Sequence, residues 1–133
     1  MAAETTTTAK GVHHVFVYGT LLTGEPNAHW AKGAKRESAS ALGTLYDPHY
    51  GFPAFSPLGT TVVKGEMLTV DDEGLASMDR LEGCPRLYRR ERIEISIAGG
   101  NATAWVYIMN RLPRNAMVIK GGDWKAYRRG GMQ

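Results

Sequence analysis

Short apolar runs separated by glycines, prolines and polar stretches dominate the chain, and this pattern predicts a fold made mostly of β-strands. The clearest run alternates, because Ile93, Ile95 and Ile97 face one way while the residues between them are polar. A glycine pair at 99–100 follows and is typical of a hairpin turn. The full pattern predicts five strands, at residues 12–18, 39–46, 61–70, 89–97 and 102–109.

One segment, residues 72–82, has the spacing of an amphipathic helix. An aspartate at position 71 or 72 can cap its start, and Gly83 can end it. A second, short helix is expected at about residues 27–34. After Asn110 the pattern dissolves, and we expect a tail without regular structure.

Many short strands with one clear helix predict an α+β protein, a small mixed, mostly antiparallel β-barrel with one or two short helices packed on it. Gly65 interrupts the predicted strand 61–70 and indicates a bulge or a sharp bend, as at a barrel corner. Small barrels of this kind can hold one ligand in their mouth.

Length and composition fit a single domain at residues 11–133, after a threonine-rich tail at residues 1–10 that is expected to be disordered. The chain has 133 residues, a net charge of +3 and one cysteine. We expect a cytoplasmic monomer without a membrane partner, because there is no disulfide framework and no apolar run near the roughly 20 residues of a membrane span. The basic residues near the end are expected to be solvated, and no basic stripe with interleaved aromatics indicates a nucleic-acid partner.

Glu82 occupies the last position of the predicted helix and shares its apolar face. Leu75, Met78 and Glu82 stand at positions i, i+3 and i+7 of one helix face, whereas Asp79 and Arg80 are expected to point to solvent. Burial and the negative end of the helix dipole both raise the pKa of a carboxyl, and a pKa nearer neutral suits a general base. The alternative is that Glu82 bends out to water, because helix ends fray.

The predicted strand 12–18 ends abruptly in Tyr18, Gly19, Thr20 and Leu21. Gly19 permits a tight turn and a close ligand approach. If the turn leaves the sheet, its N–H groups lose their ladder partners and can form a cradle for an anion or an oxyanion. The alternative is a plain transition from strand to loop.

Three stretches together resemble the gamma-glutamylcyclotransferase-like superfamily, and in particular its gamma-glutamylamine cyclotransferase branch and the small bacterial proteins grouped with it. They are HVFVYGTLLTGEPN, VKGEMLTVDDEGLASMDRLEGCPRLYRRERIEI and ATAWVYIM, and the resemblance covers roughly residues 13–110. The YGTL turn and the helix that ends in LEGCPRLYRR carry it, and the GDW near the end also looks like the small bacterial members. Residues 23–27 lack the basic residue that the family often carries, and the loop 47–55 is this chain's own.

The resemblance implies a barrel-and-helix fold around a polar cavity and a reaction that requires no cofactor. In that reaction the α-amine of a γ-glutamyl group attacks its own γ-carbonyl, so that 5-oxoproline forms and an amine leaves. It implies that the backbone of residues 18–21 holds the glutamyl group and that Glu82 is the acid/base. Further candidates for the pocket wall or mouth are Tyr88, Tyr107, Pro53 and Phe55.

Two other hypotheses stay open from the sequence. The same cavity can serve a non-catalytic binding module for a glutamyl-like carboxylate metabolite, because fold alone does not give function. It can also run the same chemistry on a larger substrate, such as a γ-glutamyl-tagged natural product or a peptide. A role for Cys84 as nucleophile is disfavoured because no motif ties a histidine to it, and no ligand spacing supports a metal site.

Overall fold

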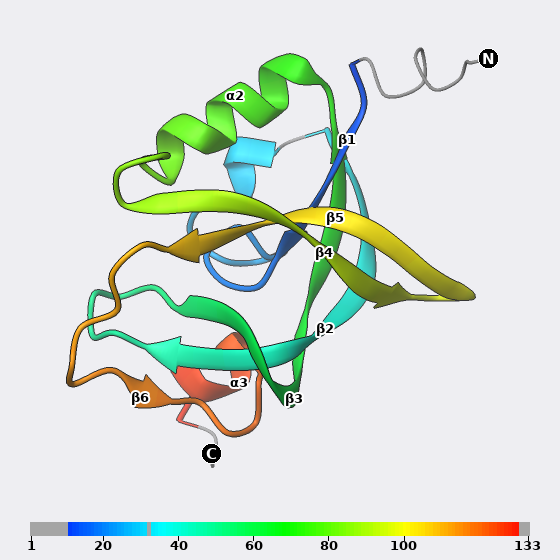
Figure 1. Cartoon of the computed structure of the whole chain (residues 1–133). Coiled ribbons are helices and arrows are strands. Elements are labelled where there is room, and N and C mark those ends of the chain that lie inside the picture. The colour runs from blue at the N-terminus through cyan, green and yellow to red at the C-terminus, as the bar shows by residue number, and fades with distance from the viewer. Residues whose placement is uncertain (1–10, 32, 131–133) are drawn as a thin grey trace.

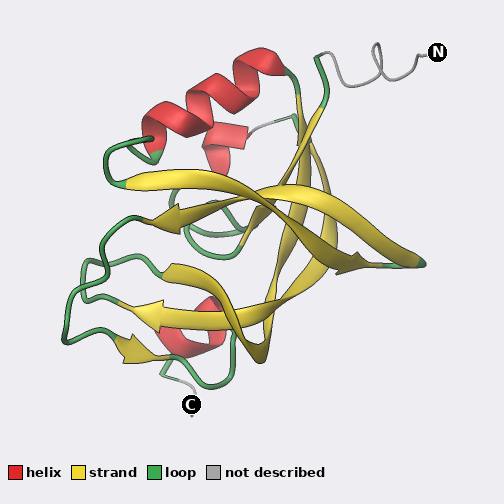
Figure 2. Cartoon of the chain, viewed as in Figure 1, coloured by secondary structure: helices red, strands yellow, loops and turns green. Residues whose placement is uncertain are grey.

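The computed structural model describes residues 11–31 and 33–130, so the expectation for the tail at residues 1–10 lies outside the described residues. Figure 1 shows the arrangement of the elements and Figure 2 their type. In chain order they are β1 (His13–Val17), the 3₁₀ helix η2 (Ala28–Ala31), β2 (Lys35–Asp47), β3 (Ala54–Val70), α2 (Asp72–Leu81), β4 (Tyr88–Ile97), β5 (Gly100–Met109), β6 (Met117–Val118) and α3 (Trp124–Arg128).

Within the described residues, the six strands form one sheet that closes on itself. The strand order is β3-β1-β5-β4-β2-β6, and a further pairing of β3 with β2 joins the first five strands into a ring with β6 outside it. β1 and β5 run parallel, whereas the other pairs are antiparallel. The predicted α+β fold, a mixed and mostly antiparallel barrel with short helices packed on it, is therefore confirmed.

β2 and β3 form a longer hairpin than the sequence pattern predicts. Pairing resumes beyond a register shift between Gly43 and Thr44, so that β3 begins at Ala54 and not at residue 61. The ladder has no register shift at Gly65, where the bulge or bend was expected. Gly65 is glycine for another reason, because a Cβ there would lie 2.2 Å from the carbonyl oxygen of Val17 on the neighbouring strand.

β4 and β5 pair along their whole length, from Tyr88 opposite Met109 to Ile97 opposite Gly100. Gly99 has a φ of 85° and makes the predicted hairpin turn. The tip of this hairpin projects away from the barrel (Figure 1). β4 pairs with β2 only near this end, through Ile97 and Ser96.

Helix α2 begins where the sequence predicts and ends one residue early. The Asp71 side chain caps it by accepting a hydrogen bond of 2.7 Å from the Gly74 amide. Glu82 is the C-cap residue, and Gly83 follows with a φ of 67°, a left-handed conformation that glycine adopts without strain. The second predicted helix, at residues 27–34, shrinks to η2, because Gly33 takes a φ of 87° just beyond it.

The segment after Asn110 is not a tail, which corrects the prediction from the sequence. Ile119 and Trp124 are 0% and 3% exposed and pack in the barrel core. The Ile119 amide donates to the carbonyl of Leu45 at 2.8 Å, and the Lys64 amide donates to that of Gly122 at 2.8 Å. These contacts attach β6 and α3 to the β2–β3 hairpin, and β6 pairs with the end of β2 that leads into the hairpin turn (Figure 1).

The buried side chains divide into two groups that meet at the end of β1. One fills the barrel interior and includes Phe16 and Val106. The other lies between the barrel and α2 and includes Met78 and Tyr107. Both faces of β5 are covered by protein, because Ala104, Val106 and Ile108 belong to the first group while Trp105 and Tyr107 pack with the second. No described helix is long and apolar enough to cross a membrane.

Candidate active site

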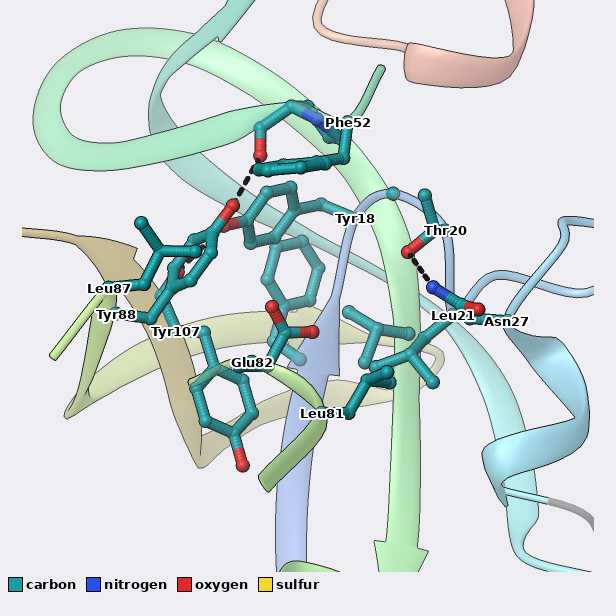
Figure 3. A pocket seen from close by; sticks show the side chains of 14 residues that line it. Tyr18, Thr20, Leu21, Asn27, Phe52, Leu81, Glu82, Leu87, Tyr88 and Tyr107 are labelled. Atoms are coloured by element: carbon teal, nitrogen blue, oxygen red, sulfur yellow. Dashed lines mark hydrogen bonds between the residues drawn. The ribbon is translucent and has the colours of Figure 1, made fainter. Parts of the chain in front are cut away.

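A cavity of about 190 Å³ opens between the turn after β1, the end of α2 and the start of β4 (Figure 3). All the site residues predicted from the sequence except Phe55 line it, namely Tyr18, Gly19, Thr20, Leu21, Pro53, Glu82, Tyr88 and Tyr107. Pockets for drug-sized ligands occupy about 300–1,000 Å³, so this one is sized for a group on the scale of an amino acid.

Glu82 reaches this cavity from the C-cap of α2, and its carboxyl lies among tyrosine rings (Figure 3). Burial raises the pKa of Glu82 from 4.5 to about 7. The side chain therefore does not bend out to bulk water. At neutral pH it is poised between its two protonation states, which a proton shuttle requires.

Three tyrosines surround Glu82, and each phenol is already engaged. Tyr18 donates to the carbonyl of Tyr107 at 2.7 Å, and Tyr88 donates to the carbonyl of Pro53 at 3.1 Å. Tyr107 donates to a carboxylate oxygen of Asp79 at 2.7 Å. Burial is the main cause of the raised pKa of each phenol. The three phenols are therefore uncharged at neutral pH, and their rings form part of the cavity wall.

Asp79 does not point freely to solvent, which corrects the expectation for the outer face of α2. Arg90 on β4 holds its carboxylate with two hydrogen bonds, at 2.7 and 3.1 Å. The Arg90 guanidinium also stacks 4.4 Å from the ring centre of Trp105. The C-terminal half of α2 is thereby tied to β4 and β5, and Arg80 remains exposed as expected.

The turn after β1 lines the cavity with Gly19, Thr20 and Leu21. Outside the strand ladders of the described residues, none of the amides of Gly19, Thr20 and Leu21 donates to a backbone carbonyl. Gly19 is also pressed against Pro53, where an added Cβ would lie 2.5 Å from the proline ring. The described geometry therefore explains this glycine by protein packing, in addition to the tight turn expected from the sequence.

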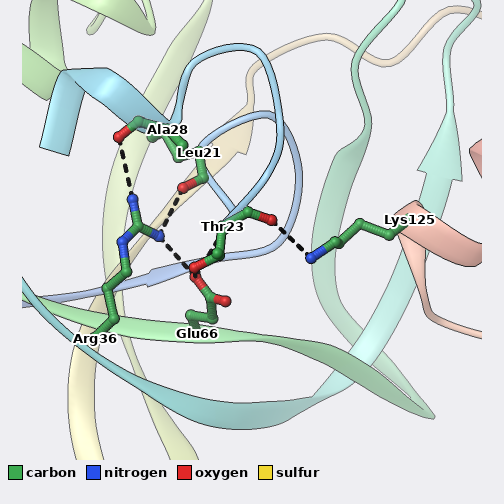
Figure 4. A network of polar contacts seen from close by, with 6 residues as sticks. All are labelled: Leu21, Thr23, Ala28, Arg36, Glu66 and Lys125. Carbon is green, nitrogen blue, oxygen red and sulfur yellow. Dashed lines mark hydrogen bonds and ion pairs between the residues drawn. The ribbon is translucent and has the colours of Figure 1, made fainter. Parts of the chain in front are cut away.

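A polar network behind the turn holds the loop that follows it (Figure 4). Arg36 on β2 donates to the carbonyl of Leu21 at 2.9 Å, to Glu66 at 2.7 Å and to the carbonyl of Ala28 at 3.2 Å. Glu66 on β3 in turn accepts from the amide and the hydroxyl of Thr23. Two strands of the barrel thus fix the loop from outside the cavity.

The C-terminal helix supports the same loop. Lys125 donates to the carbonyl of Thr23 at 2.7 Å (Figure 4), and Arg128 pairs with Glu25 at 2.6 Å. The expectation that the basic residues near the end are simply solvated is therefore wrong for these two.

The sequence pattern missed several residues of the cavity. Phe52 lines it, whereas Phe55, expected near the mouth, is 2% exposed and belongs to the barrel core. Asn27, which donates from its side chain to the Thr20 hydroxyl at 3.0 Å, also lines it. The remaining residues of the wall are Phe16, Val17, Leu81 and Leu87. Loop residues such as Phe52 have no periodicity from which this position can be inferred.

A second hollow, of about 420 Å³, lies between the β2–β3 hairpin and the β4–β5 pair. Phe55 is the only predicted site residue in its wall, and Arg89 is the only charged side chain there. The described residues also contain no group of three or more His, Cys, Asp or Glu that could hold a metal ion. The cavity at Glu82 is therefore the candidate active site.

Comparison with known protein families identifies the arrangement. Residues 15–126 match the model of a family described as "Gamma-glutamyl cyclotransferase, AIG2-like". The chain belongs to this family. Every residue that lines the cavity lies inside the matched segment, so the gamma-glutamyl cyclotransferase region includes the whole candidate site.

Individual relatives and structures agree with this assignment. The chain is 36% identical over 123 residues to the gamma-L-glutamyl-butirosin B gamma-glutamyl cyclotransferase of Niallia circulans, covering 86% of this chain and 77% of that protein. It is 31% identical over 113 residues to a gamma-glutamylcyclotransferase family protein of Escherichia coli K12, covering 83% and 94%. An uncharacterized protein from Pyrococcus horikoshii has a similar crystal structure, with a TM-score of 0.67, 28% identity and coverage of 89% and 94%.

Proposed function

We propose that the chain is a γ-glutamyl cyclotransferase that acts on γ-glutamylamines or related γ-glutamyl amides and releases 5-oxoproline and a free amine. The observation that carries the proposal is a carboxyl with a pKa of about 7 in the same small cavity as the turn at residues 19–21, whose amides, among the described residues, donate to no backbone carbonyl outside the strand ladders. Membership of the gamma-glutamyl cyclotransferase family supports the same chemistry.

In the proposed reaction, the substrate's α-amine attacks its own γ-carbonyl carbon. Glu82 accepts the proton that the amine loses and returns it to the departing amide nitrogen, whose bond to the carbonyl carbon breaks. A five-membered lactam forms, and no water is consumed. A shuttle of this kind contributes about 100- to 10,000-fold to a rate.

The second part of the proposal concerns the turn at residues 19–21, which we call the glycine turn. The amides of Gly19, Thr20 and Leu21 can hold the substrate's α-carboxylate or the developing oxyanion, because both are acceptors of backbone N–H groups. The apolar and aromatic walls hold the glutamyl chain curled. Correct intramolecular geometry is worth up to about 7–11 kcal/mol of a barrier.

The proposal extends to a monomer that works in the cytoplasm with a small molecule as its partner and without a cofactor or metal. The single cysteine and the absence of a membrane-spanning helix among the described residues are compatible with this. The size of the particle in solution is measured by sedimentation of the purified chain.

Turnover of a panel of γ-glutamyl amides by the wild type and by Glu82→Gln tests the function. We expect the wild type to release 5-oxoproline and amine in equal amounts, and Glu82→Gln to lose about 100-fold or more in kcat while KM changes little. Glu73→Gln is the matched control, because Glu73 lies exposed in the first turn of the same helix.

Two results would contradict the proposal in different ways. Equal turnover by the wild type and Glu82→Gln would remove Glu82 from the mechanism. Binding of the amides without any 5-oxoproline would replace the enzyme by the alternative, a binding module for a glutamyl-like carboxylate metabolite.

A further inference from the structure

Three apolar side chains lie beside the mouth of the cavity, and we refer to Tyr50, Phe52 and Leu87 as the apolar rim. Tyr50 is 53% exposed and Leu87 is 46% exposed, although both are large and hydrophobic. The Tyr50 and Phe52 ring centres are 5.8 Å apart, and those of Phe52 and Tyr88 are 6.3 Å apart. A row of aromatic rings therefore runs from solvent to the wall of the cavity.

The rim is held in place by contacts on the protein side. The hydrogen bond of 3.1 Å from Tyr88 to the carbonyl of Pro53 fixes the residue that follows Phe52. Pro53 also packs directly on Gly19, where no Cβ would fit. The part of the rim at Phe52 is thus preformed, and a ligand that packs on it spends little entropy on ordering the protein.

The size of the cavity leaves the substituent of the leaving group outside it. The volume of about 190 Å³ accommodates a glutamyl group next to Glu82 and the glycine turn. The substituent on the amide nitrogen must then extend past the exposed part of the wall. Figure 3 shows Leu87 beside Tyr88 on one side of Glu82, Phe52 above Glu82, and Thr20 and Asn27 on the other side.

The charges of the wall restrict what that substituent can be. Glu82 is the only charged residue among those that line the cavity. Thr20 and Asn27 are hydrogen-bonded to each other on the polar side. A cationic or anionic substituent at the rim would lose water without gaining an opposite charge, whereas an apolar one buries Phe52 and Leu87.

We propose that the leaving group is a primary amine with an uncharged aromatic or branched aliphatic substituent, which packs on the apolar rim. This inference rests on the proposed function and names its substrate class. The bond that forms joins the α-nitrogen to the γ-carbonyl carbon. The bond that breaks joins this carbon to the nitrogen of the apolar amine, which leaves with the proton carried by Glu82.

Three substrates with the same glutamyl group test the inference. They are the γ-glutamyl amides of benzylamine, of methylamine and of the lysine ε-amine, and release of 5-oxoproline is measured for each. We expect kcat/KM for the benzylamide to exceed that for the other two by about tenfold or more, the gain typical of an apolar group that fills an apolar site.

Substitutions in the apolar rim test whether the rim causes the preference for the benzylamide. We expect Phe52→Ala and Leu87→Ala each to lower the ratio of benzylamide to methylamide turnover severalfold. Leu87→Glu should shift the preference towards the lysine amide, because it supplies the missing negative charge. Leu42→Ala is the control, since Leu42 is 60% exposed on β2 and lies outside the cavity wall.

Equal kcat/KM for the three amides, or a preference that survives all rim variants, would overturn the inference while leaving the proposed function intact. Failure of the proposed function has another signature, which is no 5-oxoproline from any amide. In that case calorimetry of the benzylamide and the methylamide on the Glu82→Gln protein still measures the preference. Tighter binding of the benzylamide supports the rim, and equal affinity rejects it.

Discussion

Glu82 carries the only charge among the side chains that line the cavity, and its surroundings set its chemistry. Removal from water is the cause of its raised pKa, and no neighbouring carboxylate contributes to that rise. The helix dipole expected from the sequence is not needed to explain it. A buried acid without a cationic partner is destabilising when it ionises, so the residue that favours proton transfer weakens the fold at high pH.

The stability of the protein should therefore depend on pH through Glu82. The pKa of Glu82 is about 7 in the folded protein, above the value of 4.5 in the unfolded chain. The contribution of this carboxyl to the free energy of unfolding is therefore fully present below pH 4.5 and is lost as the pH rises through about 7. Glu82→Gln has no ionisable group at this position and so avoids this loss. We therefore expect the free energy of unfolding of Glu82→Gln, relative to that of the wild type, to be on the order of 3 kcal/mol higher above about pH 8 than near pH 4.

Urea unfolding of both proteins at the two pH values measures the difference. Glu73→Gln is again the control, since its carboxyl is exposed at the start of α2. The same stability difference between the wild type and Glu82→Gln at both pH values would show that this carboxyl titrates normally.

At the level of elements, the glycine turn is held by strands that lie behind it. Arg36 and Glu66 are 22% and 19% exposed, and their ion pair of 2.7 Å connects β2, β3 and the loop after β1. Arg36 also satisfies two loop carbonyls. The position of the amides in the cavity thus depends on residues that do not touch the cavity.

Replacement of Arg36 by Met should loosen this loop, because it keeps the aliphatic stem and removes the guanidinium. We expect a loss of about 2–3 kcal/mol in unfolding free energy, since Glu66 and two carbonyls lose their donor. KM for a γ-glutamyl amide should rise as well. A double-mutant cycle with Glu66→Gln should give a coupling of about 1–2 kcal/mol.

Arg89→Met provides the comparison, because the Arg89–Glu91 pair is 45% and 41% exposed and its loss should cost less than about 1 kcal/mol. An effect of Arg36→Met no larger than that of Arg89→Met would mean that the network does not position the loop.

Several elements could be predicted because their signal is local. The helix at α2 combines an apolar stripe, the cap at Asp71 and the stop at Gly83 within a dozen residues. β4 alternates, and the glycine pair marks its turn. The site at Glu82 followed from one carboxylate on an apolar face together with the family motifs.

The remaining features depend on contacts between distant segments. The Arg36–Glu66 pair spans 30 positions, and Lys125 reaches Thr23 across 102. Nothing in the local pattern around Arg36 distinguishes a solvated arginine from one that holds a loop. Phe52 lies in a loop. Because side-chain direction in a loop follows no regular period, the sequence pattern does not indicate that Phe52 faces the cavity.

At the scale of the whole molecule, the C-terminal segment packs into the core of the barrel. Trp124 is 3% exposed and packs with the core that also contains Phe16. Its apolar residues are few and widely spaced, which is why the sequence indicated a tail. The same segment carries Lys125 and Arg128 to the loop beside the site, so packing of the barrel core and support of that loop are linked.

Truncation of Trp124 to Ala should consequently behave as a core mutation. We expect a loss of about 3–5 kcal/mol in unfolding free energy, the usual range for a buried Trp. Trp30→Ala is the matched control, because Trp30 is 43% exposed on η2. Comparable urea midpoints for the two variants would restore the interpretation of this segment as a tail.

The projecting β4–β5 hairpin is a suitable place to attach a label to the protein. Its tip, Ala98 and Gly99, is separated from Tyr88 by the length of β4, about 30 Å at the usual rise per residue. It is exposed and makes a turn that tolerates inserted residues. A dye or an affinity peptide placed there would immobilise or report on the molecule while leaving access to Glu82 unobstructed.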